Sequence, residues 1–254
     1  MLPPLRTPAL ERNDRAPDAG VTVFGEPAPF QVGRHRHPIW KAVLPLGGHA
    51  WLRPDTGACV TAAGLIVPPE FAHTCGVTSG YVALFIDPTL IRPGLGPVAL
   101  EPATVRRLHA ALSSAPADAV AVAVAVAVAV AELAARTGAG APSLDPRVAH
   151  AVRRGLLGEP PAVIAADVGL SMPRLRALVR AAVGVPLVRL RRWGRLRAAV
   201  SALPGGSVAS AAAEAGFADQ AHLARTAREL LGRTPDSLRK SGCGAGAGGV
   251  SCIG

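Results

Sequence analysis

Two stretches of the chain, residues 173–183 and 219–231, place arginine and glutamine on one side of a predicted helix. Leucine or valine recurs three and four residues apart within them, as at Leu175, Leu178 and Val179, which assigns the other side to a core. The residues opposite the two apolar faces are Pro173, Arg176, Ala177, Arg180, Gln220, Ala221, Arg225 and Arg228. Arginine and glutamine can form paired hydrogen bonds with guanine and adenine in the major groove, so these faces are candidate DNA contacts.

The distribution of charge helps to distinguish DNA contacts from a basic helix that is merely solvated. The chain has 254 residues and a net charge of +10. Residues 1–146 hold 11 Lys and Arg and 11 Asp and Glu, whereas residues 147–254 hold 16 and 6, so the whole surplus lies in the C-terminal part. Such a region usually faces a polyanion, either nucleic acid or an acidic membrane surface. Two arginine-bearing helices within it favour double-stranded DNA as the partner.

Each arginine-bearing helix is expected to be the second helix of a helix-turn-helix unit. Gly169 follows a first helix that starts near Pro161, and Gly216 follows one that Ser207 can cap. Between the units, residues 187–203 predict a linker helix whose 17 residues span roughly 26 Å. With the half-widths of the units, the recognition helices would lie about 34 Å apart, close to one turn of duplex DNA. Both are therefore expected to enter successive major grooves.

The predicted linker helix combines one tryptophan with several arginines. Trp193 is expected to anchor the helix in the core of both units. The arginines around it are expected to face solvent or phosphate, and these are Arg191, Arg192, Arg195 and Arg197.

Residues 21–100 contain short runs of β-forming residues separated by glycine and proline. The runs are VTVF at 21–24, IWKAVLPL at 39–46, AWLRP at 50–54, CVTAAGLIVP at 59–68 and YVALFI at 81–86. Several short strands at this spacing predict a small antiparallel barrel or sandwich.

Residues 101–143 predict a helical connector that contains an alternating Ala/Val run. This run, residues 119–131, has 13 apolar residues, fewer than the roughly 20 that a membrane-spanning helix needs. Helix-like sequence on both sides favours a helix over a strand. A helix that is apolar on all sides must be buried, and pairing with its copy in a homodimer would bury it. A low-complexity linker is the alternative.

The cysteines and the chain ends bear on the compartment. The four cysteines are Cys59, Cys75, Cys243 and Cys252. They form no C-x-x-C pair, which argues against a disulfide framework and a structural zinc site and predicts a cytoplasmic location. Residues 1–20 lack the apolar segment of a signal peptide and predict a disordered leader. Residues 241–254 are glycine-rich and predict a disordered tail.

The C-terminal part resembles the AraC/XylS family of bacterial transcription regulators. The resemblance covers residues 161–239 and is carried by IAADVGLSMPRLRALVRAAVGVPLVRLRRWGRLRAA and AAAEAGFADQAHLARTARELLGRTPDSLR, with a Gly-Phe turn and a Gly-x-Thr-Pro ending. It implies that residues 144–240 form a DNA-binding domain of two helix-turn-helix units joined by a long helix. Base reading would then carry over to Pro173, Arg176, Gln220, Ala221 and Arg225. The chain departs from the family pattern at Pro173, Ala177 and Ala227.

Many regulators of this family carry a cupin-like effector domain, which the resemblance assigns to residues 21–100. GRHRHPIW then matches the His-x-His of a first cupin motif at His35 and His37, and GLIVPPEFAH matches a second motif that closes at His73. Three imidazoles suit zinc, iron, copper or nickel, with Cys75 as a soft fourth ligand. Lys41 stands where a cupin metal site has glutamate, which favours a metal-free effector pocket, with no resident cofactor, over a transition-metal site.

These observations predict an α+β chain. A small antiparallel cupin-like β-barrel at 21–100 precedes the helical connector at 101–143 and the all-α double helix-turn-helix domain at 144–240. The predicted function is a sequence-specific transcription regulator that responds to a small-molecule effector and has no catalytic residues and no membrane partner. A second copy of the chain and RNA polymerase are further candidate partners. The alternative is a cupin-type metal-dependent enzyme with an accessory nucleic-acid-binding module, which the incomplete metal set disfavours.

Overall fold

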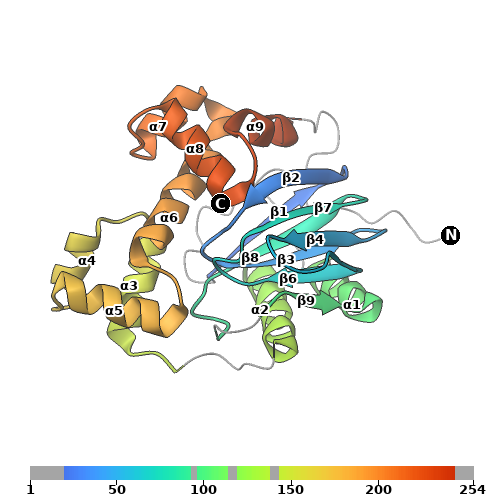
Figure 1. The fold of residues 1–254 in the computed structure, drawn as a ribbon, viewed down its shortest axis with the longest axis horizontal. Helices are drawn as coiled ribbons and strands as arrows, with labels where there is room; N and C mark the ends of the chain where they lie inside the picture. Colours follow the sequence, from blue (N-terminus) through green and yellow to red (C-terminus); the bar gives the residue numbers. More distant parts are fainter. Residues whose placement is uncertain (1–19, 93–95, 114–118, 138–142, 244–254) are drawn as a thin grey trace.

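A β-rich N-terminal domain packs beside a helical C-terminal domain (Figure 1). The computed structural model describes residues 20–92, 96–113, 119–137 and 143–243. The mixture of strands and helices confirms the predicted α+β class. The predicted disordered leader and tail lie almost wholly outside the described residues. Within the described ranges, no helix is both long and apolar enough to cross a membrane.

The strands of the N-terminal domain form two antiparallel sheets. The five-stranded sheet has the order β1 (Val21–Glu26), β8 (Tyr81–Ile86), β3 (Trp40–Pro45), β6 (Gly64–Val67) and β9 (Val98–Leu100). The four-stranded sheet has the order β2 (Phe30–His35), β7 (His73–Val77), β4 (Ala50–Pro54) and β5 (Val60–Ala62). Strands β2 and β7 lie outside the runs that the sequence predicts, because glycine and polar residues interrupt them.

The two sheets form an open sandwich: of the barrel or sandwich that strand spacing predicts, the sandwich is correct, and the cupin-like β-barrel is not closed. In the described part of the chain, no strand ladder joins one sheet to the other. The space between the sheets is filled by apolar side chains, such as Val32 and Leu52 from one sheet and Leu65 and Val67 from the other. Strand number and spacing predict antiparallel structure, but they carry no information on whether the edge strands pair with each other.

Two helices, α1 (Pro102–Ser113) and α2 (Ala119–Arg136), cover the outer face of the five-stranded sheet (Figure 1). The Ala/Val repeat is therefore helical, as its flanking sequence indicates. One face of α2 is buried through Val126 and Leu133, but Val124 and Val128 are 57% and 54% exposed. The helix is thus buried on one side by its own domain. A homodimer that covers the other side stays a prediction.

The C-terminal domain consists of two helix-turn-helix units on either side of a linker helix. Its helices are α3 (Pro146–Leu156), α4 (Pro161–Asp167), α5 (Met172–Val183), α6 (Leu187–Ala202), α7 (Val208–Glu214), α8 (Gln220–Leu231) and α9 (Pro235–Cys243). The turn glycines Gly169 and Gly216 have φ of 63° and 71°, a left-handed conformation that glycine adopts without strain. Ser207 accepts a hydrogen bond from the Ser210 N–H at 3.0 Å, which confirms the predicted cap.

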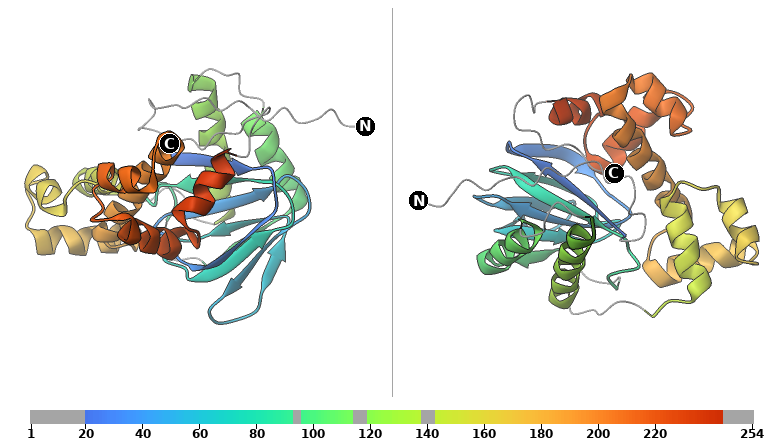
Figure 2. Two further views of the ribbon diagram at one scale, coloured as in Figure 1. Left: turned by 90° about the horizontal axis from the view of Figure 1, so that it is seen from above. Right: turned by 180° about the vertical axis from the view of Figure 1, so that it is seen from behind.

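The two domains share packed surface (Figure 2). Ile39, which precedes β3, is buried in the core of the C-terminal domain. The rings of Phe85 in β8 and Trp193 in α6 lie 5.3 Å apart between centroids. Trp193 is buried in the helical core, as predicted, and it also contacts the sheet. The recognition helix α8 lies against β2, so the second helix-turn-helix unit is positioned by the N-terminal domain.

Candidate DNA interface and regulatory sites

The recognition helices α5 and α8 turn their arginines away from the core. Leu175 and Val179 of α5, and Leu223 and Leu230 of α8, are buried in the core of the C-terminal domain. All eight residues predicted to contact DNA are exposed, namely Pro173, Arg176, Ala177, Arg180, Gln220, Ala221, Arg225 and Arg228. The guanidinium groups of the four arginines in this set have no ion-pair partner among the described residues. These groups are therefore available to base edges and phosphates.

The caps of the recognition helices place the predicted base-reading residues in the first two turns. Asp219 accepts a hydrogen bond from the His222 N–H at 2.6 Å, so α8 begins with Gln220 and Ala221. Pro173 lies in the first turn of α5, where its missing N–H costs nothing. The first turns of a recognition helix are the part that contacts base edges in helix-turn-helix complexes.

The arginines of α6 contact the protein itself, which corrects the expectation that they face solvent or phosphate. Arg195 donates from Nε to the carbonyl oxygen of Ala215 at 3.0 Å, and its guanidinium lies 4.5 Å from the Phe217 ring centroid. Arg191 donates from Nε to the carbonyl oxygen of Gly158 at 3.1 Å. The carbonyls lie just after helices, where backbone acceptors lack helical partners. A sequence shows the charge but not these acceptors, which come from other elements.

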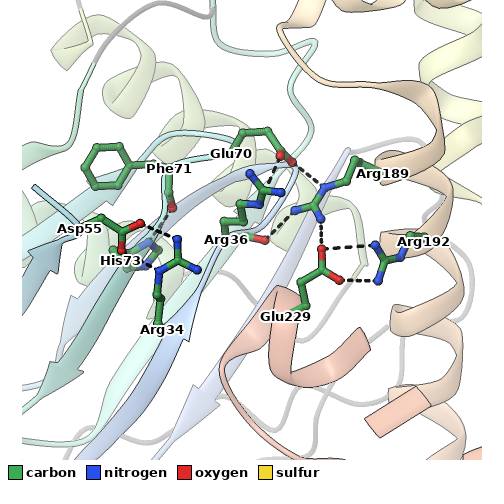
Figure 3. Close-up of polar contacts among 9 residues, drawn as sticks. All are labelled: Arg34, Arg36, Asp55, Glu70, Phe71, His73, Arg189, Arg192 and Glu229. Atoms are coloured by element: carbon green, nitrogen blue, oxygen red, sulfur yellow. Dashed lines mark hydrogen bonds and ion pairs between the residues drawn. The ribbon is translucent and has the colours of Figure 1, made fainter. Parts of the chain in front are cut away.

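Charged side chains join the two domains beside this helix (Figure 3). Arg189 of α6 donates from Nε to Glu70 Oε1 and from Nη2 to the carbonyl oxygen of Arg36, both at 3.0 Å. The Arg189 guanidinium also pairs with Glu229 of α8, whose Oε2 lies 2.5 Å from Nη2 of Arg192. The Arg36 N–H in turn donates to the carbonyl oxygen of Glu229 at 3.0 Å. Both helices therefore hold the peptide backbone of Arg36.

A cavity of about 80 Å³ lies between the domains. Aromatic and aliphatic side chains from both domains line it, including Phe24, Phe30, Phe85, Trp193, Leu196 and Leu231. A single water needs roughly 10–15 Å³ on this scale, so the cavity has room for an organic group. The interior of the sandwich beside His73 offers only about 10 Å³. The larger of these two cavities is thus interdomain, and the three histidines do not line it.

Basic side chains reach this interdomain cavity. Lys41 is buried, and its ammonium lies 5.8 and 5.6 Å from the ring centroids of Phe30 and Phe85. Burial lowers the pKa of Lys41. Its ammonium forms no ion pair with a carboxylate of the described residues. Arg233, by contrast, donates to Glu26 at 2.8 Å. An apolar cavity with an unpaired lysine is suited to an apolar molecule that carries an acid group.

His35, His37 and His73 lie together, as the two predicted motifs imply. One ring nitrogen from each lies within 4.8 Å of the others, and all three residues are buried. The Nδ1 atoms hydrogen-bond to backbone carbonyls of Gly33, Ile39 and Phe71 at 2.9, 2.7 and 2.8 Å. The three Nε2 atoms are buried without a partner in the described chain.

Burial keeps these imidazoles neutral near physiological pH. Burial lowers the pKa of His35 to about 3 and that of His73 to about 4, and it lowers the pKa of His37 well below its ordinary value. Cys75 is buried on β7, two residues from His73, but it does not belong to the group of close ring nitrogens. The structure therefore brings together the three histidines and leaves out the predicted fourth ligand.

The interdomain residues were not identifiable from sequence. The network of Arg36, Glu70, Arg189 and Glu229 joins residues far apart in the chain, and local periodicity carries no signal of such pairs. Lys41 is the exception, because a basic residue in a buried strand, at a position where glutamate is expected, marks an unusual site.

Comparisons with known proteins agree with this arrangement. Residues 164–241 match a family model described as a helix-turn-helix domain. The C-terminal domain is an AraC-type helix-turn-helix domain. It includes both recognition helices and the linker helix, and the resemblance to the AraC/XylS family is thereby confirmed. Among curated protein sequences, none matches this chain.

Most of the chain, across both domains, is also similar in fold to crystal structures of ToxT from Vibrio cholerae. An apo ToxT variant is 12% identical, with a TM-score of 0.58 over 87% of this chain and 97% of that one. ToxT bound to an unsaturated fatty acid is 13% identical, with a TM-score of 0.54 over 86% and 94%. ToxT bound to (E)-4-(8-methylnaphthalen-1-yl)but-3-enoic acid is 11% identical, with a TM-score of 0.55 over 87% and 97%. At this identity the likeness shows a shared fold.

Proposed function

We propose that the protein is a sequence-specific DNA-binding transcription regulator that responds to a small-molecule effector. The AraC-type domain with two exposed, arginine-bearing recognition helices carries this proposal. The buried linker helix α6 fixes the spacing between them, so both can read one DNA site. Such a regulator acts on DNA in the cytoplasm, which is the location we propose.

The effector class follows from the interdomain cavity. Its walls are mainly apolar, and the buried Lys41 ammonium has no carboxylate partner among the described residues. We therefore propose an effector with an apolar body and one carboxylate, which would pair with Lys41. The similar ToxT structures were solved with an unsaturated fatty acid and with a substituted butenoic acid, and both molecules have this composition. Because the cavity touches both domains, occupancy can change how they dock.

DNA binding is tested by selecting bound fragments from a genomic library with the purified full-length protein. A regulator should enrich a small set of related sites near promoters. Uniform recovery of fragments would contradict sequence-specific binding. A cupin-type enzyme with an accessory module would instead turn over a substrate and would show no effector-dependent change in DNA affinity.

The effector is tested on the selected site with a series of unsaturated fatty acids. We expect one or more of these acids to change the affinity of the wild type for DNA, and Lys41→Met to lose this response because the carboxylate loses its partner. Arg53→Met, which removes an exposed basic group of the same domain, is the matched control and should respond like the wild type. An unaltered response in Lys41→Met would exclude this lysine as the carboxylate partner.

A further inference from the structure

The three-histidine cluster has fixed tautomers. A carbonyl oxygen only accepts hydrogen bonds, so the Nδ1 atom of each neutral ring carries the hydrogen and Nε2 carries a lone pair. Three buried lone pairs, from His35, His37 and His73, therefore lack a donor in the described chain. A single water has only two hydrogens to donate and leaves one of them unsatisfied. One metal cation can be coordinated by all three Nε2 lone pairs.

The chemistry of the donors identifies the class of cation. Neutral imidazole is a ligand for zinc, copper, iron and nickel, and not for magnesium or calcium. Metal-binding histidines usually donate their other ring N–H to a carbonyl or carboxylate, as each of these rings does. Around a tetrahedral ion with bonds of about 2.0–2.1 Å, ligand nitrogens lie roughly 3.3 Å apart. The present nitrogens lie within 4.8 Å of one another, so binding would draw them together by less than about 1.5 Å.

We propose that His35, His37 and His73 bind one divalent first-row transition-metal ion, and that its occupancy is transmitted to the DNA-binding domain through the backbone of Arg36. The ligand set is three neutral nitrogens with an open position for water or an anion, since Lys41 occupies the place of a carboxylate and Cys75 is not in the group. The first half stands on the cluster itself. The second half rests on the proposed function.

The route of transmission is short. Arg36 lies between two of the ligands, and its N–H and C=O are held by Glu229 of α8 and Arg189 of α6. The C-terminal end of the recognition helix α8 also lies close to β2. A Cβ added at Gly232, the residue that ends this helix, would lie 3.0 Å from Nδ1 of His35. Drawing the histidines together would shift the segment on which α8 is docked. Metal and DNA should therefore influence each other's affinity by the same factor.

Metal binding is tested on the tag-free full-length protein after removal of metal with a chelator. Titration with Co²⁺ should show one equivalent bound, visible absorption of a four- or five-coordinate ion, and displacement by Zn²⁺. His37→Gln and His73→Gln should each weaken binding by more than the roughly 10 to 100-fold that loss of an outer-shell partner costs. His49→Gln, at an exposed position, is the control and should bind like the wild type. Zn²⁺ should raise the melting temperature of the wild type and of His49→Gln, and should leave that of His37→Gln and His73→Gln unchanged.

The transmission is tested with Arg189→Gln, which leaves the histidines intact but removes the guanidinium that holds the Arg36 carbonyl. We expect Zn²⁺ to change the affinity of the wild type for its selected DNA site at least threefold, and Arg189→Gln to bind Zn²⁺ normally while this change disappears. The metal site is overturned if the wild type binds no equivalent of Co²⁺. It is also overturned if His37→Gln and His73→Gln both bind Co²⁺ like the wild type. Normal metal binding with equal DNA affinity in both metal states overturns the transmission alone. Failure to find any DNA site would overturn the proposed function and leave the Co²⁺ result intact.

Discussion

At the scale of single residues, arginines in the C-terminal domain serve two purposes. Arg176 and Arg225 lie exposed on recognition helices, whereas Arg189 and Arg195 are used within the protein. The sequence separates these groups correctly for α5 and α8, because helical periodicity places the leucines on the opposite face. It fails for α6, because the partners of those arginines come from distant elements. The exposed group is therefore the one in which substitution should affect base preference.

Arg176→Ala and Arg225→Ala should each relax base preference in a different segment of the DNA site, about ten base pairs apart, since the helices belong to separate units. Each loss should amount to roughly 1–3 kcal/mol if the guanidinium contacts a guanine edge in bidentate fashion. Selection of bound sequences from a randomised site measures both effects. Arg106→Ala, an exposed arginine on α1, is the control and should leave the preference unchanged. If both variants relax the same base pairs, the two units do not occupy successive grooves.

At the scale of elements, local signals predicted the helices better than the strands. The starts of α5, α7 and α8 follow from turn glycines and a cap that lie just before them in sequence, namely Gly169, Ser207 and Gly216. Strands β2 and β7 were missed because their stability comes from pairing with each other, and their residues alternate poorly. These two strands carry His35 and His73. The sequence therefore predicted the motif histidines but not the paired strands that bring them together.

Gly194 in the middle of α6 illustrates a packing requirement that the sequence conceals. A Cβ added there would clash with the Leu156 carbonyl at the end of α3, so the close approach of α3 and α6 depends on a glycine. An exposed helical glycine replaced by alanine normally gains about 0.5–1 kcal/mol. Gly194→Ala should instead lower the free energy of unfolding by about 1–3 kcal/mol, as overpacking does.

Urea denaturation of the full-length protein measures this change. Gly205→Ala provides the comparison, since an added Cβ meets nothing within 4 Å there, and its stability should stay within about 0.5 kcal/mol of the wild type. Stabilisation by Gly194→Ala would mean that α3 and α6 pack less closely than described.

At the scale of the whole molecule, the two domains differ in net charge and in the sites that they carry. The N-terminal half is electrically balanced and carries the sandwich, the histidine cluster and about half of the cavity wall. The C-terminal part carries the whole surplus of +10 and the exposed recognition helices. Composition alone predicted this division. The docking of the domains through Ile39, Phe85 and Trp193 could not be predicted, because it depends on surfaces that form only after each domain folds.

This division predicts how salt should affect DNA binding by the full-length protein. Each phosphate that a basic residue neutralises releases a counterion, so the logarithm of affinity falls with the logarithm of salt concentration by about 0.9 per contact. Loss of one phosphate contact, as expected in Arg228→Ala on the exposed face of α8, should reduce that slope by about 1. Arg106→Ala in the balanced N-terminal half should leave it unchanged. Fluorescence anisotropy between 50 and 200 mM salt (roughly the range over which several phosphate contacts change affinity by orders of magnitude) measures the slopes. An equal slope for wild type and Arg228→Ala would place that arginine outside the phosphate interface, and a slope near zero for the wild type would show that the basic surplus does not face DNA.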